Sequence, residues 1–142
     1  MFTFPATVIF DEETSQYEIS FQDLAGIDAV SFSQEDVELD ALDALLAGVG
    51  ELIDSRSRIP APTELKDGSF AVHLPVLASL KVALSNAMLA TGTPKAQLAR
   101  KLGLNGPQTE RLLDIGYASK AELLEQALYL LGYQVSVAVT PL

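Results

Sequence analysis

The chain has no cysteine and a single histidine among its 142 residues, and it has no long apolar run. The absence of cysteine excludes disulfides, thiolate catalysis and cysteine-based zinc sites. About 18 consecutive apolar residues would be needed to cross a bilayer, and the first residues show no basic segment followed by an apolar stretch. We therefore expect a cytoplasmic protein that does not bind a membrane.

Basic residues are also scarce, and they are unevenly distributed. Residues 1–80 contain 3 basic and 15 acidic side chains, a net charge of −12, whereas residues 81–142 contain 6 basic and 4 acidic ones, a net charge of +2. The hydrophobic content of 49 % is enough to form a core at this length. The two halves are expected to bind different partners, although acidic residues on a helix face commonly serve only solvation.

The first half has the pattern of an antiparallel sheet with one helix. Apolar and polar residues alternate over 2–10 and 17–21, which predicts two strands with one buried face each. A third strand is expected at 29–32 and a fourth at 70–74. Between them, Ser33 is expected to cap a helix with an apolar face. The order predicts a βββαβ domain over residues 1–75 in an α+β protein.

The second half, residues 76–142, is predicted to be helical. A helix over 76–90 precedes residues 93–132, which have the pattern of three short helices. In this stretch Thr93 can cap the first helix and Gly103 can end it, and the pairs Asn105–Gln108 and Ser119–Glu122 both have the spacing of a capping box. Two short helices joined by a glycine-containing turn indicate a helix-turn-helix.

The last segment predicts a strand and, through it, a dimer. Residues 133–139 alternate, with Val135, Val137 and Val139 on one side. A single strand after a helical region needs a partner, and the same strand of a second copy supplies one by symmetry. The sequence therefore predicts a homodimer or a higher oligomer.

No arrangement of residues predicts catalysis, a metal site or a cofactor. Asp11, Glu12 and Glu13 fall in one expected turn and Asp23 in another, whereas a two-metal nuclease needs clustered carboxylates. His73 alternates out of phase with the apolar residues of its strand and is expected on the surface. There is no glycine-rich phosphate loop and no pairing of a nucleophile with a base.

Several short motifs, in this order and spacing, resemble the helix-turn-helix branch of the HicB antitoxin family of type II toxin–antitoxin systems. They are FQDLAG at 21–26, IPAP at 59–62, QLAR at 97–100, PQTERLLD at 107–114 and the final ALYLLG ending at Gly132. The resemblance implies an N-terminal domain resembling a degraded ribonuclease H fold that neutralises a small basic, mRNA-cleaving HicA-like toxin. It also implies a C-terminal domain that binds operator DNA and represses its own operon.

The resemblance and the charges together define the expected sites. Asp11, Glu12, Glu13 and Asp23 are expected to bind the toxin. Base or phosphate contacts are expected from the polar residues of the helix-turn-helix, although capping alone also explains two of them, Asn105 and Gln108. The full set is Lys95, Arg100, Asn105, Gln108, Arg111 and Lys120. The alternative function is a free-standing dimeric transcriptional regulator whose acidic N-terminal domain binds another ligand or protein.

Overall fold

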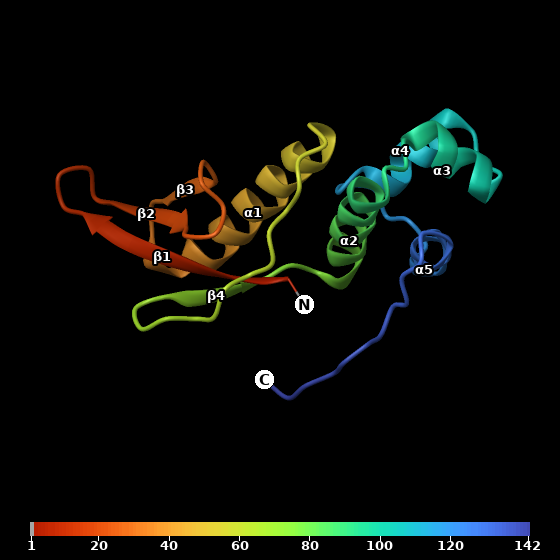
Figure 1. Cartoon of the computed structure of the whole chain (residues 1–142). Helices are drawn as coiled ribbons and strands as arrows, with labels where there is room; N and C mark the ends of the chain where they lie inside the picture. The colour runs from red at the N-terminus through yellow and green to blue at the C-terminus, as the bar shows by residue number, and fades with distance from the viewer. Residues whose placement is uncertain (1) are drawn as a thin grey trace.

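The computed structural model describes residues 2–142 and consists of a small sheet with one long helix, followed by a group of four helices (Figure 1). The predicted α+β class is confirmed. Apolar residues of both parts form one continuous buried cluster, with Phe4 and Ile19 at the sheet and Leu98 and Leu124 among the later helices.

The sheet contains the four strands β1 (Thr3–Asp11), β2 (Gln16–Phe21), β3 (Asp28–Ser31) and β4 (Phe70–His73). Their order is β3-β2-β1-β4 and every neighbouring pair is antiparallel. The four predicted strands of residues 1–75 are therefore present, each within a few residues of its expected bounds. The hairpin register places Phe10 opposite Tyr17, and their rings lie 4.8 Å apart.

Helix α1 (Val37–Asp54) packs on one face of the sheet through residues at every fourth position. The predicted cap is wrong, because the Ser33 hydroxyl donates to the Asp36 carboxylate at 2.9 Å and accepts no backbone N–H. A short 3₁₀ turn, Gln34–Asp36, precedes the helix instead. The buried residues of α1 are Val37, Ala41, Leu45, Val49 and Ile53.

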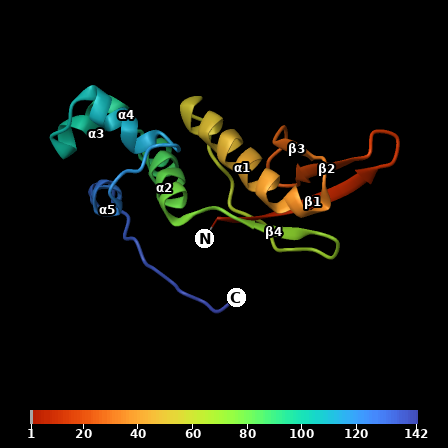
Figure 2. The same cartoon turned by 180° about the vertical axis from the view of Figure 1, so that it is seen from behind.

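The prediction of one buried face along all of β1 is wrong beyond Ala6. Val8 is 38 % exposed and Phe10 is 47 % exposed, although both alternate in phase with the buried Phe4. The β1–β2 hairpin projects past the region that α1 covers, as both views show (Figures 1 and 2). An apolar face at that end therefore has no helix on it.

The proline-containing segment between α1 and β4 is held at two points. The side chain of Asn86 accepts from the Ile59 backbone N–H at 3.0 Å and donates to the Ile59 carbonyl at 2.9 Å. Farther along, both carboxylate oxygens of Asp23 accept hydrogen bonds from Thr63. These contacts attach the segment to the later helices and to the end of β2.

The later helices are α2 (Val76–Thr91), α3 (Lys95–Leu102), α4 (Gly106–Leu113) and α5 (Ala121–Leu130). Helix α2 packs against α4 and α5 and also touches α1, so it joins the two parts of the molecule (Figure 1). Among the described residues, no single helix is long and apolar enough to span a bilayer. Only α2 and α3 taken together meet that criterion, and the chain bends by 109° between them.

The predicted strand at 133–139 does not form in the single chain. Residues 134–142 have no regular secondary structure and run away from the helices (Figure 2). Val135 is partly buried against the core, whereas Val137 is 82 % and Val139 is 91 % exposed. A strand is held by hydrogen bonds to a neighbouring strand, and none lies beside this segment.

Candidate functional site

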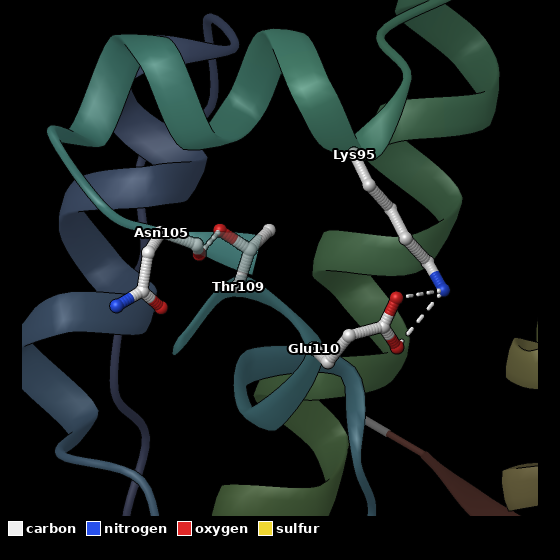
Figure 3. A network of polar contacts seen from close by, with 4 residues as sticks. All are labelled: Lys95, Asn105, Thr109 and Glu110. Atoms are coloured by element: carbon white, nitrogen blue, oxygen red, sulfur yellow. Dashed lines mark hydrogen bonds and ion pairs between the residues drawn. The ribbon is translucent and has the colours of Figure 1, made fainter. Parts of the chain in front are cut away.

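Helices α3 and α4 occupy the stretch that the sequence predicts as a helix-turn-helix, and local sequence explains the turn between them. Gly103 ends α3 in the left-handed conformation at φ 67°, which favours glycine. Asn105 Oδ1 accepts from the Gln108 N–H at 2.8 Å, and Gln108 Oε1 accepts from the Asn105 N–H at 3.0 Å. This capping box is therefore confirmed, and the Thr109 hydroxyl adds a bond to the Asn105 carbonyl at 2.9 Å (Figure 3).

Two other predicted caps are absent. Thr93 bonds the Thr91 hydroxyl, and α3 begins after Pro94 without a side-chain cap. Ser119 does not cap α5 either, because its hydroxyl lies within hydrogen-bond distance of the Lys81 ammonium and of the Arg111 carbonyl. In both cases the predicted capping hydroxyl bonds another side chain instead of a backbone N–H of its helix.

Lys95 and Glu110 connect the two helices of the helix-turn-helix. The Lys95 ammonium lies 2.8 Å and 3.1 Å from the two carboxylate oxygens of Glu110 (Figure 3). Their side chains are 37 % and 61 % exposed, so water screens the pair and its effect on stability is small. A phosphate placed beside this pair would compete with Glu110 for the Lys95 ammonium.

The remaining predicted DNA-binding residues are exposed, but they do not all have free side chains. Arg100 lies on α3, Arg111 on α4, and Lys120 immediately precedes α5. The Arg111 guanidinium lies 5.5 Å from the ring centre of Tyr117, a distance at which a cation and an aromatic face attract. Gln108 turns its amide oxygen toward the backbone, so its Nε2 group remains as the donor for an outside ligand.

Sequence reasoning missed Lys81, which is 0 % exposed within α2. Its ammonium contacts the carbonyl oxygens of Arg111 at 2.9 Å, Asp114 at 2.6 Å and Tyr117 at 2.7 Å, and the Ser119 hydroxyl at 3.0 Å. The sequence did contain a sign that this lysine is buried, because position 81 falls on the apolar stripe of residues 77, 84 and 88.

Two opposing influences act on the charge of Lys81. Burial removes water from the ammonium and lowers the pKa of Lys81 from its ordinary value of 10.5, while the Asp114 carboxylate acts to raise it. All the atoms that bind the ammonium can accept hydrogen bonds. The site therefore suits a protonated lysine in a structural role.

The four predicted toxin-binding residues are not brought together. Asp11 ends β1, and Glu12 and Glu13 follow in the turn at the tip of the hairpin, with the Glu13 N–H bonded to Asp11 at 3.0 Å. Asp23 follows the other end of β2, where Thr63 occupies both of its carboxylate oxygens. Only the first three form one acidic surface.

The sheet also has an open face, opposite α1, that combines apolar and acidic residues. Ile9 lies opposite Glu18 in the β1–β2 pair, and Glu18 lies opposite Val30 in the β2–β3 pair. Ile9 is 66 % exposed and Val30 is 47 % exposed, and Glu18 between them is also exposed. At the edge of the same face, His73 points away from the core as predicted, and Thr3 bonds it at 2.9 Å.

An apolar groove lies between α2 and the C-terminal segment. Its volume is about 580 Å³, and Leu80, Ala87, Leu128 and Val135 line part of it. Within residues 2–142, no cluster of three or more side chains has the arrangement of a metal site. The surfaces that remain for function are the acidic hairpin, the open sheet face, the helix-turn-helix and this groove.

Comparison with known proteins identifies the family. Residues 3–83 match the family model described as the HicB_like antitoxin of bacterial toxin-antitoxin system. The chain is similar to Antitoxin HicB of Pseudomonas fluorescens (strain Pf0-1), with 35 % identity over 90 % of this chain and 88 % of that protein. It is also similar to Antitoxin HicB 2 of Photorhabdus laumondii, with 29 % identity over 88 % of each chain.

A third relative extends the similarity to another organism. Antitoxin HicB of Escherichia coli (strain K12) is 28 % identical over 70 % of this chain and 72 % of its own length. The family model covers more than half of the described sequence, and the Pseudomonas protein aligns through the helix-turn-helix as well. On these grounds the chain belongs to the HicB-like antitoxin family, which supports an antitoxin role and implies a toxin partner.

Proposed function

We propose that this chain binds and neutralises a small basic, mRNA-cleaving HicA-like toxin through its N-terminal domain, residues 1–75. Residues 76–142 then bind operator DNA as a homodimer or higher oligomer and repress the operon that encodes both proteins. The chain acts in the cytoplasm and performs no chemistry of its own.

The open face of the sheet is the observation that carries the toxin-binding part of the proposal. The exposed side chains of Ile9 and Val30 flank Glu18 on a half of the chain with a net charge of −12. An exposed apolar pair supplies area to bury against a protein, and the acidic surroundings attract a basic one. A toxin that binds RNA carries a basic surface, so this face and RNA would compete for it.

The hairpin tip extends this surface. Asp11, Glu12 and Glu13 lie at the end of the sheet beside Ile9, and Asp11 alternates in phase with Ile9 along β1. We assign toxin contacts to this acidic tip and to the open face next to it. The carboxylate of Asp23 already accepts hydrogen bonds from Thr63. We therefore propose that Asp23 contributes to toxin binding indirectly, by holding the segment that contains Thr63 in place.

Helix α4 is proposed to enter the major groove of operator DNA. The N-terminal residues of such a helix approach base edges, and guanine offers two acceptors that suit arginine. The exposed amides of Asn105 and Gln108 at the start of α4 are proposed base contacts. Arg111, three residues after Gln108 on the same side of the helix, is proposed to reach a guanine with its longer side chain. The proposed phosphate contacts are Arg100, Lys120 and, once Glu110 releases it, Lys95.

The C-terminal segment is proposed to pair with its counterpart in a second copy. Val137 and Val139 are almost fully exposed in the single chain, and Val135 lines the groove beside α2. Antiparallel pairing of two such segments would satisfy their backbone groups and cover these valines. A dimer also compensates for a net charge of only +2 over residues 81–142, because two units bind one DNA molecule.

Co-expression with the product of the adjacent short reading frame tests the proposal. If that frame encodes a small basic protein, we expect a stable complex and loss of its RNA cleavage. Replacement of Ile9 and Val30 by lysine should release the toxin. Leu65→Lys is the matched control, because Leu65 is 56 % exposed in the segment between α1 and β4.

The outcomes separate the two functions. Absence of any stable complex with the basic protein would overturn the antitoxin role and leave the free-standing transcriptional regulator. A complex that tolerates lysine at positions 9 and 30 as well as it tolerates Leu65→Lys would keep the antitoxin role but reject the open face as its site.

A further inference from the structure

Lys81 is the one charged residue of α2, and it is fully buried. Burial of an ammonium group without partners is strongly unfavourable, so its position requires compensation by hydrogen bonds. The four oxygen atoms that surround it all belong to one stretch, residues 111–119. This stretch contains the end of α4 and the connection to α5.

The Lys81 ammonium also lies at the C-terminal end of α4, where a positive charge is favourable. Carbonyl groups in the last turn of a helix lack intrahelical partners and give that end a partial negative charge. Lys81 donates to the Arg111 carbonyl within the last turn of α4, and to the carbonyl of Asp114 just beyond it. A cation from α2 thus fixes the C-terminal end of α4.

The same stretch is held from a second direction. Ile115 packs against Gly50 of α1, and a Cβ atom at position 50 would lie only 2.9 Å from the Ile115 Cγ2 atom. The glycine therefore permits this close approach. Together, Lys81 and Gly50 connect the end of α4 to both of the long helices.

The residue most affected by this arrangement is Arg111. Lys81 binds its carbonyl oxygen and also the carbonyl oxygen of Tyr117, the residue whose ring lies 5.5 Å from the Arg111 guanidinium. The ammonium itself lies 5.7 Å from the same ring centre. The backbone positions of both members of the Arg111–Tyr117 pair therefore depend on Lys81.

We propose that Lys81 is a positioning residue for operator recognition, which holds α4 and Arg111 in the one orientation that fits the operator. The inference rests on the proposed DNA binding and adds a residue that never touches DNA. Its effect is on specificity, because phosphate contacts made by flexible surface side chains tolerate a change in helix orientation that base contacts do not.

The variant Lys81→Met should fold, which makes the proposal testable. Each carbonyl that loses Lys81 keeps another backbone donor: Arg111 keeps the Asp114 N–H, Asp114 keeps the Tyr117 N–H, and Tyr117 keeps the Ser119 N–H. Methionine has a similar length and no charge to bury. Lys66→Met is the matched control, since Lys66 is an exposed lysine remote in sequence from α4.

The experiment measures affinity for operator DNA and for unrelated DNA of equal length, at one salt concentration, with the full chain. In Lys81→Met we expect operator affinity to fall on the order of tenfold, as for the loss of one base contact, with binding to unrelated DNA unchanged. Toxin neutralisation should also be unchanged. Lys66→Met should keep the ratio of the two DNA affinities.

A second measurement applies whether or not DNA binds. Residual dipolar couplings in solution give the orientation of α4 relative to α2, and we expect it to differ or to become averaged in Lys81→Met. If the wild type shows no preference for any operator, the proposed DNA binding fails, and the couplings still test the positioning role. Equal specificity ratios, or unchanged couplings, in wild type and Lys81→Met would overturn the positioning role.

If Lys81→Met does not fold, Ser119→Ala replaces it. This variant keeps the ammonium and removes one of its four acceptors, the hydroxyl at 3.0 Å. A smaller loss of specificity in the same direction is expected, and an unchanged ratio would count against the proposal.

Discussion

The ammonium nitrogen of Lys95 lies 2.8 Å from Oε1 of Glu110, so the first helix of the helix-turn-helix is ionically bound to the second. This contact uses one of the few basic side chains in the chain and places a carboxylate on the exposed side of α4. If this chain binds DNA as proposed, Glu110 and a phosphate compete for Lys95, and that competition partly sets the affinity for DNA.

The substitution Glu110→Gln tests this competition. Because it removes a negative charge and frees Lys95, we expect operator affinity to rise several-fold. The slope of log affinity against log salt concentration should become steeper by the amount expected for about one more phosphate contact. The free energy of unfolding should change by no more than about 1 kcal/mol, since the pair is exposed. Filter binding at several salt concentrations measures the slope. Glu125→Gln on α5 makes the same charge change, and an equal gain there would assign the effect to net charge alone.

Arg111→Ala should weaken operator binding and leave toxin neutralisation intact. Loss of a bidentate contact to a base costs about 1–3 kcal/mol, or roughly 5- to 150-fold in affinity. Arg111→Lys keeps the charge and distinguishes base recognition from a phosphate contact. If lysine restores full affinity and specificity, Arg111 contacts only a phosphate. Electrophoretic mobility shifts with the operator, and RNA cleavage with the toxin, give the two readouts.

Deletion of residues 134–142 should reduce both oligomerisation and operator affinity. Tyr133 is retained, because its N–H bonds the Leu128 carbonyl at 2.9 Å and completes the end of α5. Analytical ultracentrifugation measures the mass. The paired substitution of Val137 and Val139 by aspartate should act in the same direction, because like charges would face one another in the antiparallel pair. A truncated monomer that still binds the operator tightly would reject the pairing of C-terminal segments.

Asp23→Ala should lower the free energy of unfolding by about 1 kcal/mol, since Thr63 loses an acceptor for both its N–H and its hydroxyl. Toxin affinity should change less than in a variant with Glu12 and Glu13 replaced by glutamine, because those side chains lie at the hairpin tip. Urea denaturation and titration calorimetry give the two values. A large loss of toxin binding in a fully stable Asp23→Ala protein would place Asp23 in the interface.

The pH dependence of stability should reveal Lys81. Burial lowers the pKa of Lys81 in the folded chain below the value of 10.5 that applies when the chain unfolds. Between those two pKa values the unfolded chain binds more protons, so stability rises with pH. Wild type should therefore gain stability relative to Lys81→Met as the pH rises from the lowered pKa of Lys81 toward 10.5. Below the lowered pKa, the stabilities of the two proteins should change with pH in parallel. Urea denaturation at several pH values tests this, and a difference that shrinks with rising pH would mean that the carbonyl oxygens raise the pKa of Lys81.

Elements defined by neighbours in sequence were predictable. The alternation of apolar and polar residues identified the β1–β2 hairpin, and the three-residue spacing of Asn105 and Gln108 predicted the capping box at the start of α4. Gly103 ends α3 as predicted, with a positive φ. The predicted helix caps at Ser33 and Ser119 were wrong, because the hydroxyl of each serine bonds another side chain. Propensity and periodicity describe a residue's own element, but they carry no information on what packs against that element.

The sequence by itself determined the order of the strands and helices, the acidic and weakly basic halves, and the motifs that place the chain near the HicB antitoxins. Only the tertiary structure decided which polar side chains are free to bind a partner. It paired Asp23 with Thr63, 40 residues away, Lys81 with oxygens 30 to 38 residues away, and Lys95 with Glu110. Such contacts depend on how elements distant in the sequence pack against one another, and a hydrogen bond forms only where that packing brings donor and acceptor within about 3 Å.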